Sequence, residues 1–247
     1  MSLKSVAQSV REKLTQLVFP QSCIYCEGDR RGGGSFLCLA CEEDILCIDG
    51  PVCGVCGAPA EMSYDYPREN FECGACRRRP CHFDRARSWG RYDAVLKKLM
   101  HFYKYRPQRG AVSELESLMR RSMPYDGATL ENFHIVSVPL HKNKLKERQF
   151  DQAFLIARAL AHYYGLPLAN EWVVKIRDTA SQAKKNRTER MKNVRGAFQA
   201  LDGDAIKGRN ILLVDDVYTT GATVNEVAKT LKSAGCASVY VFTLARA

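Results

Sequence analysis

The sequence predicts an α/β protein in which a parallel sheet follows a small metal-binding domain. Four Cys-x-x-Cys pairs lie between Cys23 and Cys76, and beyond residue 85 short hydrophobic runs alternate with helical patterns. Strands that alternate with helices along the chain usually form a parallel sheet with helices on its faces. We therefore expect a cysteine-rich domain at residues 1–84 and an α/β domain at residues 85–247.

The composition favours anionic partners. The 247 residues are 46% hydrophobic and carry a formal net charge of +10. This charge favours nucleic acid, phosphorylated ligands or an acidic membrane surface, although a generally basic proteome would also explain it. No apolar run is long enough to span a bilayer, and charged residues interrupt the N-terminus. We therefore expect a cytoplasmic protein with no membrane span and no secretion signal.

Residues 3–18 have the pattern of an amphipathic helix. Val6, Val10, Leu14 and Leu17 share one face, and charged residues lie on the other. Because the polar face is not strongly basic, we expect this helix to pack on the following domain rather than on a membrane.

The cysteine pairs predict two structural Zn²⁺ sites. Two pairs complete a tetrahedral site that leaves no coordination position open for catalysis, and a redox role for one dithiol fits this spacing less well. Sequence order assigns the first two pairs to one zinc and the last two to a second, while crossed pairing stays open. Cys47 and Cys81 fall outside the pattern, and His82 is interpreted as incidental. The predicted ligands are Cys23, Cys26, Cys38, Cys41, Cys53, Cys56, Cys73 and Cys76.

The segment from Arg77 to Arg109 is strongly basic and allows two interpretations. Basic residues interleaved with rings form a plausible surface for single-stranded nucleic acid. Alternatively, a helix begins near Asp93, with Val95 and Leu99 on its buried face and the lysines in solvent. The rings concerned are Phe83, Trp89, Tyr92, Phe102, Tyr103 and Tyr105.

Alternating elements are predicted from residue 111 to the end of the chain. A helix at 111–123, a strand at 133–138 and a helix that Gly165 ends form a βα unit leading to a parallel strand at 172–176. An extended segment at 197–199, a turn at 202–204 and a last strand at 238–244 complete the pattern.

Two polar segments are candidates for contact with a charged ligand. The cationic loop at 139–148 follows a strand and suits a pyrophosphate, although a solvated basic turn is the alternative. Residues 177–195 lack a core pattern and are rich in charge, which is typical of a lid that excludes water from a reacting centre.

The segment 211–223 is the most informative part of the sequence. A buried strand is followed by Asp215 and Asp216, a Thr/Gly turn and the start of a helix. Ligands of parallel α/β proteins bind at the carboxyl ends of strands, and amide groups at a helix start suit a phosphate. The two carboxylates would repel phosphate, but they can accept hydrogen bonds from ribose hydroxyls or help to hold a metal.

This segment resembles the signature of type I phosphoribosyltransferases, which bind 5-phosphoribosyl-1-pyrophosphate (PRPP) and have a Rossmann-like fold. The resemblance implies that Asp215 and Asp216 bind the ribose diol, and that Mg²⁺ accompanies PRPP. It places the 5-phosphate at Thr219, Thr220, Gly221, Ala222 and Thr223, and the pyrophosphate at Pro139, Leu140, His141 and Lys142. It also implies a lid with Gln182, Arg187, Arg190 and Asn193.

Nearly the whole chain resembles the ComF family of competence-associated proteins, which join a double zinc ribbon to a phosphoribosyltransferase-like domain. The similarity rests on the signature and on residues 102–105, 138–141, 147–153, 179–182, 189–190 and 193–198. Lys184, Lys185 and Gln149 depart from the usual family pattern. The resemblance implies a role in DNA uptake during natural transformation, with single-stranded DNA and the DNA-uptake helicase machinery as partners.

The sequence leaves two functions open. One is a PRPP-binding module that handles DNA without catalysis. The other is an active phosphoribosyltransferase on an unidentified nitrogen acceptor, in which Asp215 and Asp216 would be catalytic. Thr219 stands where purine-salvage relatives often carry an acid, and the chain stops at Ala247 directly after the last strand. We therefore expect no protein base at Thr219 and no C-terminal hood, which favours the first function.

Overall fold

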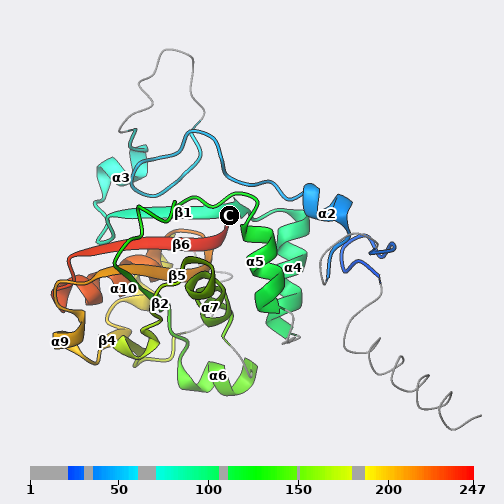
Figure 1. Ribbon diagram of the computed structural model, residues 1–247. Helices are drawn as coiled ribbons and strands as arrows, with labels where there is room; N and C mark the ends of the chain where they lie inside the picture. Colours follow the sequence, from blue (N-terminus) through cyan, green and yellow to red (C-terminus); the bar gives the residue numbers. More distant parts are fainter. Residues whose placement is uncertain (1–21, 31–35, 61–70, 106–110, 149–150, 180–186) are drawn as a thin grey trace, which may run out of the picture.

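The computed structural model describes residues 22–30, 36–60, 71–105, 111–148, 151–179 and 187–247. Its centre is a parallel four-stranded sheet of order β1-β6-β5-β2 (Figure 1). The strands are β1 (Arg85–Arg91), β2 (Phe133–Ser137), β5 (Asn210–Tyr218) and β6 (Ser238–Arg246). This confirms the predicted α/β class with a parallel sheet. The helix predicted at 3–18 lies outside the described residues.

Helices cover both faces of the sheet because its two central strands are apolar on both sides. On β5, Leu212 and Val214 belong to one core cluster, and Ile211 and Leu213 belong to the other. The first cluster includes residues of α4 (Ala94–Tyr105), α5 (Ala111–Met119) and α7 (Gln152–Tyr164). The second includes residues of α10 (Ala222–Ser233).

Both ends of the helix α7 have local causes, and its end at Gly165 is as predicted. The Asp151 carboxylate accepts a hydrogen bond from the Phe154 amide at 3.2 Å and caps the N-terminus. Gly165 ends the helix in the left-handed conformation with φ 67°.

The strand predicted at 172–176 is formed, but it does not join the parallel sheet. β3 (Val173–Lys175) pairs antiparallel with β4 (Phe198–Ala200) in a separate two-stranded sheet. Residues 167–169 occupy the free edge of β2 instead. The Ile135 amide donates to the Pro167 carbonyl, and the Ala169 amide donates to the Ile135 carbonyl. The 3-10 helix η1 (Asn170–Trp172) then turns the chain away from that edge.

Three segments expected to be loops or turns are partly helical. The basic loop contains α6 (Lys142–Arg148), and the predicted lid contains α8 (Arg187–Val194). The predicted turn at 202–204 begins α9 (Gly203–Ile206), which Asp202 caps by accepting from the Ala205 amide at 2.9 Å. Polar, charged windows of this kind form short helices when an end is capped or the segment packs on a neighbour.

The cysteine-rich segment forms two units, which we call the first ribbon (described residues of 22–45) and the second ribbon (described residues of 51–79). They contain the short helices α2 (Leu39–Glu43) and α3 (Gly74–Arg78), which lie far apart in Figure 1. The chain between them lies antiparallel to the end of β1, where the Ile48 amide donates to the Trp89 carbonyl. Nearer the start of β1, the Ala86 amide donates to the Val55 carbonyl of the second ribbon. The first ribbon shares the core of α4, α5 and α7, and the second shares the core of α10.

Candidate ligand site and metal centres

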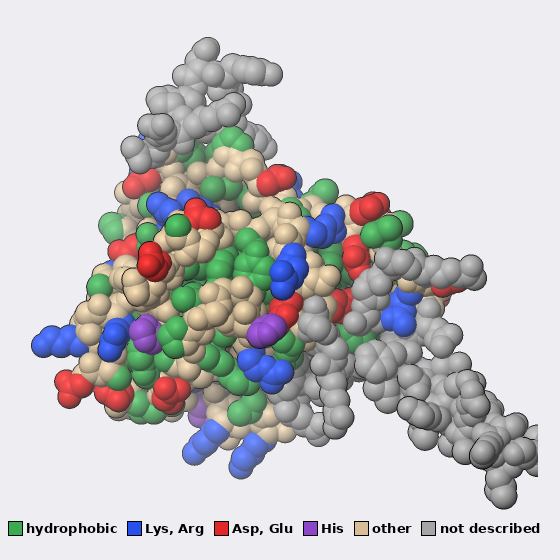
Figure 2. Space-filling view, in the orientation of Figure 1, with side chains coloured by type: hydrophobic (Ala, Val, Ile, Leu, Met, Phe, Trp, Pro, Cys, Tyr) green, Lys and Arg blue, Asp and Glu red, His purple; other side chains and the backbone are tan. Residues whose placement is uncertain are grey.

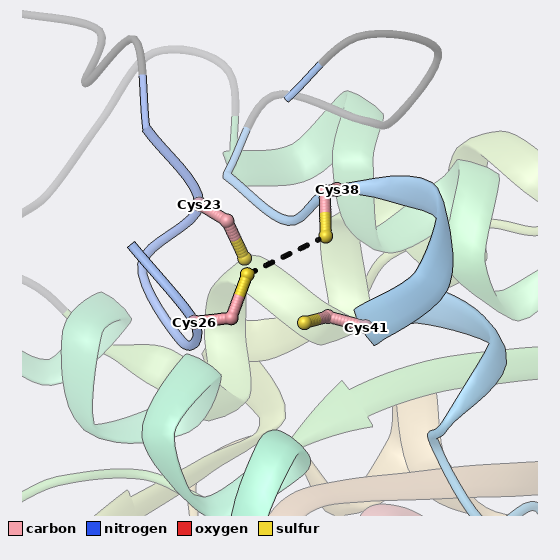
Figure 3. A group of neighbouring side chains, drawn as sticks. All are labelled: Cys23, Cys26, Cys38 and Cys41. Carbon is pink, nitrogen blue, oxygen red and sulfur yellow. Dashed lines mark hydrogen bonds between the residues drawn. The ribbon is translucent and has the colours of Figure 1, made fainter. Parts of the chain in front are cut away.

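The structure gathers the eight predicted cysteine ligands into two sets of four. Cys23, Cys26, Cys38 and Cys41 form one set, and Cys53, Cys56, Cys73 and Cys76 form the other. The sulfur atoms of each set lie within 4.8 Å of one another, and those of the first point toward a common centre (Figure 3). Pairing therefore follows sequence order and is not crossed.

The two sets fit a tetrahedral zinc ion. The Sγ atoms of Cys26 and Cys38 are 3.7 Å apart, and those of Cys56 and Cys73 are also 3.7 Å apart. Four thiolates at about 2.3 Å from a zinc ion would be about 3.8 Å apart. The Cys73 amide donates to the Cys53 sulfur at 3.3 Å, which supports the negative charge of a thiolate.

The thiols of each set are held where they cannot all ionise without a cation. Burial raises the pKa of Cys56 to about 11 and, with the neighbouring thiols, raises the pKa of Cys41 and Cys76 further. Although burial opposes it, hydrogen bonds from the Cys76 backbone and the Cys56 thiol lower the pKa of Cys73 to about 7. A bound divalent cation would stabilise all four thiolates together.

The carboxylates of Asp215 and Asp216 are fixed by the backbone of β5. The strand extends to Tyr218, so Asp215 is still paired with Thr243 of β6 rather than lying in the following loop. The Asp216 amide donates to Asp215 Oδ1 at 2.9 Å, and the Val217 amide donates to Asp216 Oδ1 at 2.7 Å. Successive strand residues point to opposite faces, so the two carboxylates flank the end of β5.

A cavity of about 310 Å³, which we call the β5 cavity, lies at this end of the sheet. It is bounded by residues that follow β2, by the start of α7, by β3, by α8 and by the end of β5 with its turn. The lining residues are Val138, Pro139, Leu140, Asp151, Gln152, Ala153, Lys175, Arg190, Asp215, Asp216, Val217, Thr219 and Thr223.

Three carboxylates, those of Asp151, Asp215 and Asp216, meet at the β5 cavity. Burial, together with the charges of Asp216 and Asp151, raises the pKa of Asp215 well above its usual range. Burial likewise raises the pKa of Asp151, and Asp216 adds to this. Burial and the nearby Lys144 lower the pKa of Lys175, while Asp215 opposes that shift. A divalent cation bound to the carboxylates would stabilise their charged forms, and anionic oxygens of a ligand would stabilise the charged form of Lys175.

The turn after β5 presents a helix N-terminus beside this cavity. Gly221, at φ 74°, caps α10, and a Cβ on it would overlap the ring and hydroxyl of Tyr218. Only glycine therefore fits between Tyr218 and the helix. The first amide groups of a helix have no partner within it, which suits a phosphate group. Thr219 and Thr223 of this turn line the β5 cavity.

The predicted PRPP residues divide between two cavities and the surface. Thr220, Gly221 and Ala222 line a second cavity on the other side of the turn. His141 and Lys142 are not among the residues that line the β5 cavity. His141 is buried, with Nδ1 3.5 Å from Asp178 Oδ2, whereas Lys142 is exposed at the start of α6.

The predicted lid residues also have different positions. Arg190 of α8 lines the β5 cavity, and the Asn193 carbonyl accepts from Arg177 at 3.0 Å. Arg187 begins α8, and Gln182 lies outside the described residues.

Asp151 and Lys175 line the β5 cavity but were not among the predicted site residues. Each stands where a general rule could have marked it. Asp151 is the capping residue of a helix that follows a strand, and Lys175 is the last residue of a strand. Strand ends and helix starts at one edge of a sheet are the usual positions of ligand contacts.

Three of the six rings proposed for stacking on nucleic acid are buried. Phe83, Trp89 and Tyr103 are 3% exposed or less, Tyr92 and Phe102 are half-buried, and the Tyr105 side chain lies outside the described part of the chain. Val95 and Leu99 lie on the buried face of α4, as the helical interpretation expects. On the face in Figure 2, Lys and Arg side chains are interspersed with Asp and Glu. Over the described part of the chain, no helix combines the length and the apolar character that crossing a bilayer requires.

Family models of known proteins match two parts of the chain. Residues 14–79 match the family model of the double zinc ribbon domain, and residues 151–247 match that of the phosphoribosyl transferase domain. Adenine phosphoribosyltransferase from Thermoanaerobacter pseudethanolicus aligns over 61% of this chain and 86% of its own, at 14% identity and a TM-score of 0.35. That structural likeness is too low to add to the assignment.

The relatives cover almost the whole chain. Competence protein F of Haemophilus influenzae is 30% identical over 91% of this chain and 96% of its own length. DNA utilization protein YhgH of Escherichia coli is 30% identical over 93% and 99% respectively. Competence protein ComFC of Bacillus subtilis is 32% identical over 85% and 84%. The chain therefore belongs to the ComF family, whose members join a double zinc ribbon to a phosphoribosyltransferase-type domain.

Proposed function

We propose that this protein binds PRPP with Mg²⁺ in the β5 cavity and acts in the uptake or utilisation of DNA. One observation carries the PRPP assignment, namely the meeting of Asp215, Asp216 and Thr223 with Lys175 in one cavity of about 310 Å³. The carboxylates would bind the ribose hydroxyls and the magnesium ion. Thr219 and Thr223, the residues of the 219–223 turn that line this cavity, would bind the 5-phosphate through their hydroxyls and the nearby backbone amides.

Lys175 and Arg190 are the cations that we assign to the pyrophosphate. Both line the cavity, whereas Lys142 of the predicted pyrophosphate loop does not. The backbone of Pro139 and Leu140 would approach the same group, as the sequence predicts. Magnesium would neutralise pyrophosphate charge, and the residues of this chain would orient the ribose and exclude water.

The two zinc sites have a structural role in this proposal. Each has four thiolate ligands, so no position is open for a reacting water molecule. A role in DNA handling is supported by the names of the relatives and by the net charge of +10. We assign single-stranded DNA to Lys and Arg side chains outside the β5 cavity, without stacking on the buried rings, and infer a cytoplasmic location and contact with the DNA-uptake helicase machinery.

Calorimetric titration of the zinc-loaded protein with PRPP and Mg²⁺ tests the ligand assignment. We expect micromolar binding that falls by at least about 100-fold in the Asp215→Asn/Asp216→Asn variant, because both oxygen pairs lose their charge. Asp204→Asn is the matched control, since Asp204 is exposed in α9. Absence of binding in the wild type would remove the proposal, and equal weakening in the control would show a nonspecific effect of charge.

The DNA assignment has a separate readout. Fluorescence anisotropy with labelled oligo(dT) should show the same affinity, to within about twofold, for the wild type and the Asp215→Asn/Asp216→Asn variant. A large loss in that variant would place DNA in the β5 cavity rather than on a separate basic surface.

An active phosphoribosyltransferase on a nitrogen acceptor is the second candidate. It is favoured by the second cavity of about 480 Å³, which shares Thr219 with the β5 cavity and has room for an acceptor. In that case pyrophosphate would leave C1 of the ribose as the acceptor nitrogen bonds to it. Release of pyrophosphate from PRPP only in the presence of a candidate acceptor would establish this activity.

A further inference from the structure

A second, larger cavity lies between the second ribbon and the turn that follows β5. We call it the ribbon cavity, and its volume is about 480 Å³. One wall comes from Cys56, Cys73 and Cys76 with the segment that leads from α3 to β1. The opposite wall comes from α8 and from the start of α10. Cavities of this size accommodate small organic ligands, and this one far exceeds a single phosphate ion.

Basic residues outnumber carboxylates among the side chains that line the ribbon cavity. Five basic residues line it, and Glu226 is the only carboxylate among its described lining residues. The Glu226 carboxylate also accepts a hydrogen bond from the Gly196 amide at 2.7 Å. The basic residues are Arg79, Lys192, Arg195, Lys229 and Arg246. Clustered cations in a partly enclosed space attract and hold anionic ligands.

Three of these cations have no carboxylate partner among the described residues. Among the described residues, no ion pair joins Lys192, Arg195 or Lys229 to a carboxylate, and all three side chains are exposed. They come from α8, from the residue just after it and from α10 respectively. Cations on separate elements that converge on one space without a counter-ion are arranged to bind an anion from solution.

The remaining walls offer polar groups suited to a sugar or a base. Thr219 and Thr220 supply hydroxyls, and the Asn225 carboxamide is fixed because its Oδ1 accepts from the His82 amide at 2.7 Å. Phe83 and Tyr218 pack edge to face at 6.4 Å, with little exposed ring area, so stacking is not the main contact. The chemistry is that of a phosphate linked to a polar, ring-containing group.

A fixed wall of this cavity comes from Arg246, the last residue of β6. Its Nη1 donates to the Cys56 carbonyl at 2.7 Å, and its guanidinium lies 4.3 Å from the centre of the Tyr218 ring. Tyr218 in turn lies directly under Gly221. The second ribbon and the ligand turn are therefore held together by contacts that do not depend on a bound ligand.

We propose that the ribbon cavity, which adjoins the β5 cavity at Thr219, binds the phosphate of a nucleotide at a position of its own. The nucleotide can be a free mononucleotide or one residue of single-stranded DNA, because both present the same phosphate and sugar. Binding itself does not require PRPP. Its use as an acceptor site rests on the proposed function, since only an occupied β5 cavity would supply the ribose.

The test uses the zinc-loaded full chain and the nucleotide dTMP as a probe. We expect Lys192→Gln/Lys229→Gln to weaken dTMP binding by about tenfold or more, while PRPP binding changes by less than about threefold. Lys97→Gln/Lys98→Gln removes the same charge from exposed positions on α4 and should leave dTMP affinity within about twofold. Asp215→Asn/Asp216→Asn should lose PRPP and keep dTMP.

Three results would overturn the proposal. They are no dTMP binding by the wild type at millimolar concentration, equal weakening in the Lys97/Lys98 control, and loss of dTMP binding in the Asp215/Asp216 variant alone. Failure of PRPP binding with retained dTMP binding would count only against the β5 cavity. Oligo(dT) with and without a 5′-phosphate then identifies the source. Competition by both oligonucleotides indicates an internal residue of a strand, and competition by dTMP alone indicates a free nucleotide.

Discussion

The two ribbons have the same local design but different surroundings. In each, the amide of the first cysteine donates to a carbonyl five residues later, as Cys23 does to Gly28 and Cys53 does to Ala58. In each, the residue four positions after that cysteine has a positive φ, 64° at Glu27 and 69° at Gly57. The two Cys-x-x-Cys turns therefore share one backbone conformation. The different residue types at its positive-φ position, glutamate in one and glycine in the other, follow from packing.

Packing separates the ribbons because they lie on opposite faces of the sheet. The first is anchored by Phe36, whose amide donates to Glu114 at 2.9 Å and whose ring lies 5.8 Å from that of Tyr103. It contacts none of the residues that line the β5 cavity through any described hydrogen bond. The second contacts Tyr218 through Arg246 and forms a wall of the ribbon cavity. The comparison suggests that the first ribbon stabilises the fold and the second also shapes the ligand region.

Removing one zinc at a time should give the largest difference between the ribbons. Structural zinc contributes on the order of 10 kcal/mol to a small domain, so either loss unfolds its ribbon. Cys76→Ala should abolish PRPP and dTMP binding, whereas Cys41→Ala should leave PRPP affinity within about fivefold. Metal analysis should show one zinc per chain in each variant. Equal loss of ligand binding in both variants would show that the ribbons act alike.

The equivalent positions Gly57 and Glu27 should respond in opposite ways. A Cβ at Gly57 would lie 2.5 Å from the Ala86 carbonyl oxygen, so Gly57→Ala combines backbone strain with a backbone clash. We expect about 4 kcal/mol of destabilisation in urea unfolding. Glu27→Gly relieves the strain of a positive φ at an exposed residue and should stabilise by up to about 1 kcal/mol. Similar effects at both positions would contradict the packing difference.

The anchor of the first ribbon should be sensitive to pH. Burial raises the pKa of Glu114 to about 7, although hydrogen bonds from the Phe36 amide and the Tyr103 hydroxyl oppose this. The folded protein then holds a proton that the unfolded chain releases at lower pH. The free energy of unfolding should therefore fall as pH rises through this window, by up to about 3 kcal/mol in total.

Urea titrations at pH 6 and pH 8 measure the upper part of this window, about 1.3 kcal/mol, in the range where zinc stays bound. Glu114→Gln cannot ionise, so its stability should change less than that of the wild type between the two values. Parallel changes in both proteins would show that another group titrates.

The link between the second ribbon and the ligand turn should give the smallest effect on stability. Arg246→Lys keeps the charge but loses the paired contacts with the Cys56 carbonyl and the Tyr218 ring. We expect about 1–2 kcal/mol of destabilisation and a several-fold loss of dTMP affinity. Arg91→Lys on β1 is the control, because Arg91 is exposed at the matching register position. Unchanged dTMP affinity in Arg246→Lys would remove Arg246 from the ribbon cavity.

Local sequence determined the elements whose physical causes are themselves local. The zinc sites follow from cysteine spacing, α7 follows from Asp151 and Gly165 at its ends, and β5 follows from its apolar run before Asp215. Their causes are the spacing of metal ligands, the capping of helix ends and the periodicity of apolar residues, and each of these acts within a few residues. The resemblance to a known family suggested PRPP as the proposed ligand, which no spacing rule could name.

Only the tertiary structure decided which elements meet. The strand at 173–175 has the composition of a sheet strand, but the edge of β2 was already occupied by residues 167–169. The cations of the β5 cavity are Lys175 and Arg190 rather than Lys142, because β3 and α8 fold back over β5. The ribbon cavity joins residues that are more than 150 positions apart, Arg79 and Arg246 among them. Such contacts depend on competition among distant partners, and a linear pattern does not record that competition.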